Sequence, residues 1–158
     1  MAQHLLAPDT LNGASGSIVV NVNGRNQVVA GMRNIQITGE IEAEEMRVIG
    51  TKKVQQKQNG VTLAGSGNIY YGSNLFTDMV LDYINNGITT EFSIQVTNND
   101  PATSVGTQTI AVYGCTLTGE IPIAILDSEE AMLNYDFEFT YSSIERLQAF
   151  TEPTRYGN

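Results

Sequence analysis

"AMLNYDFEFTY", residues 131–141, carries the most regular alternation in the chain. Its residues fall on two sides of an extended backbone: Tyr135, Phe137, Phe139 and Tyr141 on one, Asp136 and Glu138 on the other. A period of two is typical of a β-strand with one buried face and one solvated face. This stretch therefore predicts a strand that packs aromatic side chains inward and presents carboxylates outward.

The same period of two recurs along much of the chain. Residues 34–43 alternate Ile and Ala with polar residues, burying Ile41 and placing Glu40 and Glu42 on a wet face. The other strand patterns are residues 17–32, a hairpin with a type I′ turn at Asn23-Gly24; residues 61–72; residues 89–97; and residues 109–126, one strand or two joined near Gly119-Glu120. Gly65 to Gly67, inside one of these patterns, predicts a bulge.

One helix is predicted, over "SNLFTDMVLDYINNG", residues 73–87. Ser73 or Asn74 can cap its start, and Gly87 fits the left-handed position after its end. Its apolar residues recur at helical spacing: Leu75, Phe76, Met79, Val80, Tyr83 and Ile84. We therefore expect a mainly β fold, an antiparallel β-sandwich or open barrel with one inserted α-helix and a long charged hairpin loop.

The long hairpin loop is the unusual feature of this sequence. The alternation slips at Glu44-Glu45, which predicts a bulge or the end of core packing, and Asn59-Gly60 predicts a turn. Residues 47–57 hold half of the chain's eight Lys and Arg, and none follows from residue 58 to residue 143. A contact arm would pair these charges between copies of the chain through Glu44, Glu45, Arg47, Lys52, Lys53 and Lys57. The alternative is a solvated hairpin without function.

Composition argues against most other functions. A formal net charge of −9 with few basic residues opposes tight nucleic-acid binding. His4, the only histidine, lies in the expected N-terminal arm, and Cys115, the only cysteine, is expected to be a small buried apolar residue. One His and one Cys cannot build a zinc site or a catalytic pair, and the carboxylates lie on expected wet faces. No catalytic, metal or cofactor site and no membrane anchor is predicted.

We expect one domain over residues 1–158. Its parts are an N-terminal arm at residues 1–10, the extended loop at residues 40–60, and a C-terminal tail at residues 147–158 that is loose or docked on a partner. The N-terminus lacks the basic and apolar regions of a secretory signal, and a single Cys fits a reducing compartment. Synthesis in a cytoplasm follows as the expectation.

The order of these segments resembles the tail tube protein of contractile phages and tail-like particles, the PBSX-like group. The succession is the Gly-rich entry "TLNGASGSIVVNVNG", the charged "EEMRVIGTKKVQQKQNG", the helix "FTDMVLDYINNG", the strand "TEFSIQVTN" and the closing "AILDSEEAMLNYDFEFTY". It spans about residues 10–141. No single motif is diagnostic, and the succession as a whole carries the resemblance.

The resemblance implies a structural protein with no enzymatic activity and no cofactor. Such proteins form six-fold rings that stack into a hollow tube, in a virion or tail-like particle assembled in the host bacterial cytoplasm. The implied partners are other copies, the sheath protein, the baseplate or tube initiator, the tail terminator and the tape measure protein. An acidic channel would let DNA pass without holding it. Its lining would be Glu40 and Glu42, or Asp136 and Glu138.

Two other functions remain open at this point. A monomeric β-sandwich that binds a carbohydrate or a protein would need clustered aromatic side chains, for which Tyr70, Tyr71 and Tyr113 are the candidates. A carboxylate hydrolase would need a positioned pair of acids, which no motif supplies.

Overall fold

The computed structural model describes residues 3–29 and 31–157, and the chain divides into two compact units. Unit 1 comprises Met1–Ala30, Asp82–Thr116 and Ser142–Asn158, and unit 2 comprises Gly31–Leu81 and Leu117–Tyr141. Both are built on antiparallel strands, and α1 (Leu75–Asn86) is the one α-helix among the described residues. The expected mainly β, antiparallel fold with one inserted helix and a long charged hairpin is confirmed.

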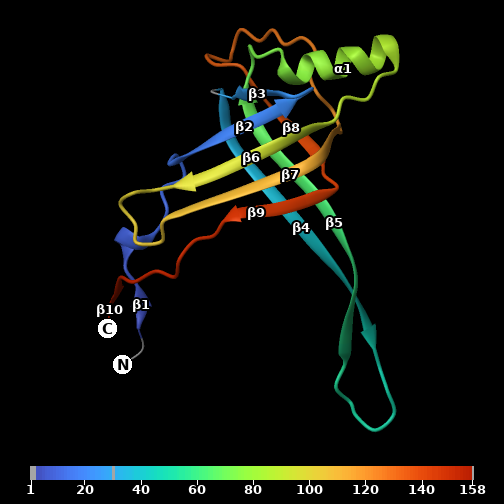
Figure 1. Cartoon of the computed structure of the whole chain (residues 1–158). Helices are drawn as coiled ribbons and strands as arrows, with labels where there is room; N and C mark the ends of the chain where they lie inside the picture. Colours follow the sequence, from blue (N-terminus) through green and yellow to red (C-terminus); the bar gives the residue numbers. More distant parts are fainter. Residues whose placement is uncertain (1–2, 30, 158) are drawn as a thin grey trace. The chain divides into compact units, whose positions relative to one another are not determined.

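Unit 1 is a sheet in the order β3-β2-β6-β7, with β9 paired to β7 (Figure 1). Its strands are β2 (Gly16–Val22), β3 (Arg25–Val28), β6 (Phe92–Asn99), β7 (Thr107–Thr118) and β9 (Ser143–Gln148). Asn23 and Gly24 have φ of 53° and 80°, which confirms the type I′ turn. Val20, Ile94 and Val112 follow one another across the strands and are fully or almost fully buried, so they anchor the core of this unit.

Unit 2 contains a three-stranded sheet in the order β8-β5-β4. Its strands are β4 (Met32–Met46), β5 (Gln55–Tyr70) and β8 (Asn134–Thr140). Phe137 stacks on Phe76 of α1 at 4.5 Å between ring centroids and on Phe139 at 6.2 Å, and all three side chains are buried. The strand predicted from residues 131–141 is confirmed over Asn134–Thr140, with Asp136 and Glu138 on its exposed side.

The helix begins and ends as predicted, but its buried stripe is shorter. The Leu75 N–H donates to Ser73 Oγ at 3.4 Å, and Gly87 follows the helix with φ of 67°. Phe76 and Met79 are buried, whereas Tyr83 and Ile84 are 62% and 60% exposed. Tyr83 and Ile84 lie on the predicted apolar side of the helix but are not covered, because helical spacing shows which side of a helix is apolar and not how far the core extends along it.

Gly65 and Gly67 do not form the predicted bulge. Both pair regularly across β5 and β8, Gly65 opposite Phe139 and Gly67 opposite Phe137. A Cβ on Gly67 would lie 2.6 Å from the Asn34 carbonyl oxygen and 2.7 Å from Phe137 Cζ. The two glycines are therefore needed to let the phenylalanine rings lie flat against β5.

We predict that Gly67→Ala destabilises the protein by about 1–3 kcal/mol, the usual cost of overpacking. The backbone oxygen of Asn34 cannot move aside as a flexible side chain would. Urea unfolding measures the change, with Gly39→Ala as the control, since a Cβ there meets only Val61 Cγ2 at 3.8 Å. Equal unfolding midpoints for the two variants would contradict this account of the glycines.

Two further expectations need correction. Asn59-Gly60 lies inside β5, so the predicted turn is wrong. The register shifts there, between Glu42 and Ala43, just before the predicted position, whereas Glu44 and Glu45 pair regularly with Lys57 and Gln56. Beyond Thr118 the chain leaves the strand at Gly119, which has a φ of 75°. Residues 119–133 form no regular strand, so the prediction of strand structure up to residue 126 is also wrong.

The two ends of the chain meet in unit 1. β1 (His4–Leu5) pairs with β10 (Tyr156–Gly157), and the 3-10 turn η1 (Ala7–Asp9) follows β1. The buried Asp9 carboxylate accepts hydrogen bonds from Ser104 Oγ at 2.6 Å, from Ser104 N at 3.0 Å and from Arg155 N at 2.8 Å. The expected arm and tail are thus held to each other and to the 100–106 loop.

This arrangement makes the stability of unit 1 depend on pH. Burial alone would raise the pKa of Asp9, but the hydrogen bonds from Ser104 and Arg155 and the nearby Arg155 charge outweigh it and lower that pKa. A carboxyl whose pKa falls on folding stabilises the native state above its unfolded pKa of about 3.9. That stabilisation disappears as the pH drops through the lowered folded value.

We therefore predict that Asp9→Asn lowers the Tm at pH 7, and that the deficit shrinks as the pH falls below about 4. Calorimetry from pH 7 to pH 3 measures it. Glu152→Gln, which removes an exposed carboxylate, serves as the control and should leave the Tm unchanged. A deficit of constant size across this range would show that the charge of Asp9 is not what stabilises the termini.

Candidate assembly interface

The outer part of the β4–β5 hairpin has no core of its own. β8 covers β5 only from Ala64 to Tyr70, and β4 and β5 continue beyond that point as a two-stranded ribbon. We define the ribbon as residues 39–62, all of which are exposed. A two-stranded hairpin is marginally stable in water, and within the described chain nothing packs on this ribbon.

The ribbon carries more apolar surface than its sequence pattern indicated. Ile41 and Val61 lie opposite each other and are both more than half exposed, so the prediction that Ile41 is buried is wrong. At the turn, Ile49 is fully exposed, and Met46, Val48 and Val54 are exposed beside it. The sequence analysis did not predict this cluster, of which Met46, Val48 and Ile49 directly precede Gly50.

The charged residues of the ribbon fall into two groups. Glu44 lies directly opposite Lys57, and Glu45 lies opposite Gln56, so one predicted acid–base pair is already adjacent within the chain. Arg47, Lys52 and Lys53 lie at the turn, where Gly50 has a φ of 106°. Among residues 3–29 and 31–157 the one ion pair is that of Arg155 and Asp9, which leaves the cations of the turn unmatched.

The four candidate channel acids share one face of the unit 2 sheet. Asn34 of β4, Asn68 of β5 and Asp136 of β8 lie in one row across the strands. Two residues along, Gln36, Ser66 and Glu138 form a second row on the same face. Strand alternation then places Glu40 and Glu42 on the same face, farther along β4. Thr62 Oγ1 donates to Glu42 Oε1 at 3.1 Å, which fits this assignment. The two alternatives left open by the sequence are thus parts of one acidic surface.

A polar network ties this face together at its β8 end. The Asn68 amide donates to Asp136 Oδ1 at 2.9 Å and to Asn134 Oδ1 at 3.1 Å. Its carbonyl oxygen accepts from Arg33 Nη1 at 3.4 Å. Asn68 is buried, and these bonds satisfy both ends of its amide. The face is therefore fixed in place rather than loosely solvated.

No arrangement for catalysis is visible in the described part of the chain. Residues 3–29 and 31–157 hold no group of three or more His, Cys, Asp and Glu side chains placed to bind a metal ion. Cys115 is buried, as predicted, and burial raises its pKa to about 12, so its thiol is inert. In the same residues no helix is long and apolar enough to cross a membrane.

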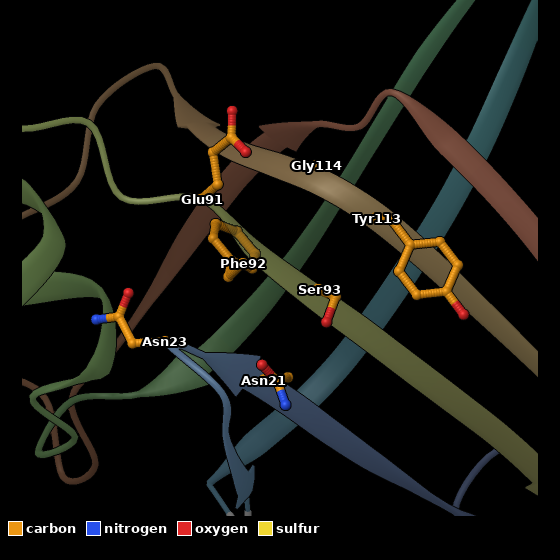
Figure 2. Close-up of a pocket in the computed structure, with 7 residues that line it drawn as sticks. All are labelled: Asn21, Asn23, Glu91, Phe92, Ser93, Tyr113 and Gly114. Atoms are coloured by element: carbon orange, nitrogen blue, oxygen red, sulfur yellow. The ribbon is translucent and has the colours of Figure 1, made fainter.

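The three tyrosines proposed for a binding module each have a separate environment. Tyr70 lies under the Arg33 guanidinium at 5.4 Å, and Tyr71 packs edge-on against Tyr135 at 6.4 Å. Tyr113 lines a pocket of unit 1 and donates to Glu145 at 3.3 Å (Figure 2). The rest of the lining is Asn21, Asn23, Glu91, Phe92, Ser93 and Gly114. Phe92 is buried, so Tyr113 is the one exposed aromatic side chain of this lining.

The sequence matches the family described as "Phage tail tube protein" over residues 3–148. The chain belongs to this family. Two curated relatives of this tail tube protein, both from Bacillus subtilis (strain 168), are the phage-like element PBSX protein XkdM and the uncharacterized protein YqbM. Each is 21% identical over 141 residues, covering 89% of this chain and 92% of the relative. The expected resemblance to the PBSX-like group is confirmed.

Solved structures share the fold of this tail tube protein. A chain of the anti-feeding prophage baseplate, reconstructed with six-fold symmetry, matches with a TM-score of 0.64 at 13% identity, over 87% of this chain and 95% of the other. A chain of the sheath–tube complex of an extracellular contractile injection system, PVC, matches with a TM-score of 0.61 at 11% identity, over 89% and 92%. At these identities the likeness establishes the fold alone.

Proposed function

We propose that this tail tube protein assembles into hexameric rings that stack as the inner tube of a contractile phage tail or tail-like particle. The tube either encloses the channel through which DNA passes or punctures a cell envelope. The observation that carries the proposal is the β4–β5 ribbon, an exposed extension with apolar and charged side chains and no core. It has a structural role only if another copy covers it.

Open strand edges support closure into a ring. In unit 1, β9 bonds to β7 on one side, and its six residues are all exposed. In unit 2, β4 is the outer strand of the sheet along its whole length. Unpaired edges of this kind invite pairing with other chains, and a closed ring removes them. The published baseplate of similar fold was reconstructed with six-fold symmetry, which supports the number six for this chain.

The partners follow from the same proposal. The structures of similar fold include a sheath–tube complex and a sheath/tube terminator assembly. For this chain we propose a sheath protein, a baseplate or tube initiator, a terminator and a tape measure protein as partners. The particle would assemble in the cytoplasm of the bacterial host. The protein acts as a structural component and not as an enzyme.

The acidic face of unit 2 is the proposed channel lining. It presents Glu40, Glu42, Asp136 and Glu138 among polar residues, with Arg33 as a single base bonded to Asn68. Protein–DNA affinity comes largely from cations that neutralise phosphates, so a carboxylate surface repels DNA and lets it slide. The scarcity of Lys and Arg in the chain fits a wall that must not retain its cargo.

Cysteine accessibility tests this orientation. We predict that Glu138→Cys reacts with a small maleimide both in free subunits and in assembled tubes. A maleimide attached to a large globular protein should label free subunits but not tubes, because it cannot enter the channel. Tyr83→Cys, on the exposed end of α1, is the control that shows whether the bulky reagent reaches an exposed residue. Bulky labelling of Glu138→Cys along intact tubes would rule out a channel-facing position.

Reversing charge at the turn of the ribbon tests the contact-arm role. We predict that Lys52→Glu with Lys53→Glu leaves the Tm unchanged, since both residues lie outside the core. Like charges in a contact cost several kcal/mol of binding free energy, and each loss of about 1.4 kcal/mol raises the dissociation constant tenfold. The concentration needed for stacking should therefore rise by about tenfold or more.

Negative-stain electron microscopy over a concentration series measures this change. Arg25→Glu, which reverses a charge on β3 of unit 1, serves as the matched control. Normal tubes from the Lys52/Lys53 variant would refute the contact arm. A wild-type protein that stays monomeric at high concentration, and enters no particle, would refute the tube itself and favour the binding module.

A further inference from the structure

The turn of the ribbon has the composition of a docking element. We call residues 46–54 the tip. Its apolar side chains are exposed: Met46, Val48, Ile49 and Val54. Arg47, Lys52 and Lys53 surround them, and the Lys53 N–H donates to Thr51 Oγ1 at 3.1 Å, which shapes the turn. An apolar centre with a cationic rim fits a surface that is apolar with an anionic rim.

One segment of unit 2 has that complementary composition. We call residues 120–132 the acidic loop. Leu126 is 100% exposed, and Ile123 and Met132 are exposed on either side of it. The loop carries four acids and no base: Glu120, Asp127, Glu129 and Glu130. Asp127 Oδ1 accepts from the Glu129 N–H at 3.0 Å, so the chain turns directly after Leu126.

The tip and the acidic loop lie at opposite ends of β5. The loop is tied to the Tyr70 end, because the Tyr71 N–H donates to the Leu133 carbonyl at 2.8 Å and Tyr71 Oη donates to the Ile123 carbonyl at 3.5 Å. The tip directly precedes Gln55, the other end (Figure 1). The 16 residues of β5 span about 50 Å at a strand rise of roughly 3.3 Å. The two surfaces therefore cannot meet within one chain.

We propose that the tip of one copy docks on the acidic loop of a second copy in the adjacent ring. Ile49 and Leu126 form the apolar centre, and Lys52 and Lys53 face Glu129 and Glu130 at its rim. This inference rests on the proposed function and names the surface that receives the ribbon. Because donor and acceptor lie at opposite ends of β5, the contact is head-to-tail and repeats from ring to ring.

The acids of the ribbon itself are weaker candidates for receiving the tip. Glu44 already lies opposite Lys57, and Glu42 accepts the Thr62 hydroxyl. Neither has an apolar residue as exposed as Leu126 at its side along the polar face. Exposed apolar side chains also lie beside an acid on β9, where Ile144 and Leu147 flank Glu145. A second competing surface is the exposed end of α1, with Tyr83 and Ile84 next to Asp82. It serves as the comparison in the test.

Crosslinking in assembled tubes distinguishes these surfaces. Ile49→Cys and Leu126→Cys are combined in one chain, assembled, and treated with a short bis-maleimide. Cys115 stays silent because it is buried and burial raises its pKa to about 12. Each copy both donates and accepts, so the expected product is a ladder of dimers, trimers and higher multimers. The matched control combines Ile49→Cys with Tyr83→Cys and should give no ladder.

Each result decides the question. A ladder from the Ile49/Leu126 pair alone supports the contact. Tubes that form but give no ladder, or a ladder from the Ile49/Tyr83 pair alone, overturn it while leaving the tube proposal intact. A wild-type protein that forms neither rings nor tubes overturns the proposed function itself.

A charge exchange covers the case in which the cysteine variants do not assemble. Lys52→Glu with Lys53→Glu, and separately Glu129→Lys with Glu130→Lys, should each lose stacking. All four changes together should restore it, because the rim charges are exchanged rather than removed. Failure of the combined variant to stack, when wild type stacks, overturns the inference. Thermal unfolding of each variant shows that the fold is retained.

Discussion

The flat packing of Phe137 and Phe139 against Gly67 and Gly65 fixes the register of unit 2, and the rest of that unit depends on it. A slip of one residue between β5 and β8 would drive a ring into a strand position that has a side chain, and would turn the apolar set outward. Because the register is fixed, the carboxylates of β4 and β8 arrive on one face. A sheet held only by backbone hydrogen bonds could not guarantee that arrangement.

The same strand that is locked at one end is unsupported at the other. β5 is buried where β8 covers it and exposed throughout the ribbon, so one element passes from core to contact arm without interruption. The aromatic packing fixes the position and direction of the covered half of β5, and the ribbon continues the strand in that direction. An exposed ribbon with apolar side chains is an aggregation hazard in a free subunit, and neighbouring charge is a common protection. The adjacent Glu44 and Lys57 keep its middle polar, and Arg47, Lys52 and Lys53 place charge beside the apolar side chains of the tip.

Much of the fold followed from the sequence, and the exceptions have physical causes. Residues 131–141 alternate so regularly that only a half-buried strand fits them, and Asn23-Gly24 and Gly87 have few conformations open to them. Gly65 and Gly67 were misjudged because a glycine within a strand is equally consistent with a bulge and with a close approach from a neighbour. Residues 121–126 are apolar without alternation and contain Pro122, so composition alone overstated their strand character.

For the candidate interface, the clustering of charged residues in the sequence indicated which segment is the ribbon. The adjacency of Glu44 and Lys57, the common face of the acids and the exposure of Ile49 and Leu126 all depend on tertiary register, which a single sequence does not encode in any local pattern.

The uneven distribution of basic residues along the chain can be explained from the surfaces at the two ends of β5. Half of the basic residues lie within eleven positions, and the stretch without any base includes both the β8 face and the acidic loop. A further base on that face, in addition to Arg33, would hold phosphates, and a base in the loop would repel the tip. Two different constraints therefore exclude Lys and Arg from the same long segment. Local positive charge helps a strongly negative chain to associate with its own copies, and its place at the end of a long ribbon keeps it far from the proposed channel face. In the proposed tube, the net charge of −9 and the cationic tip serve one requirement, that the protein bind other copies and not the DNA in the channel.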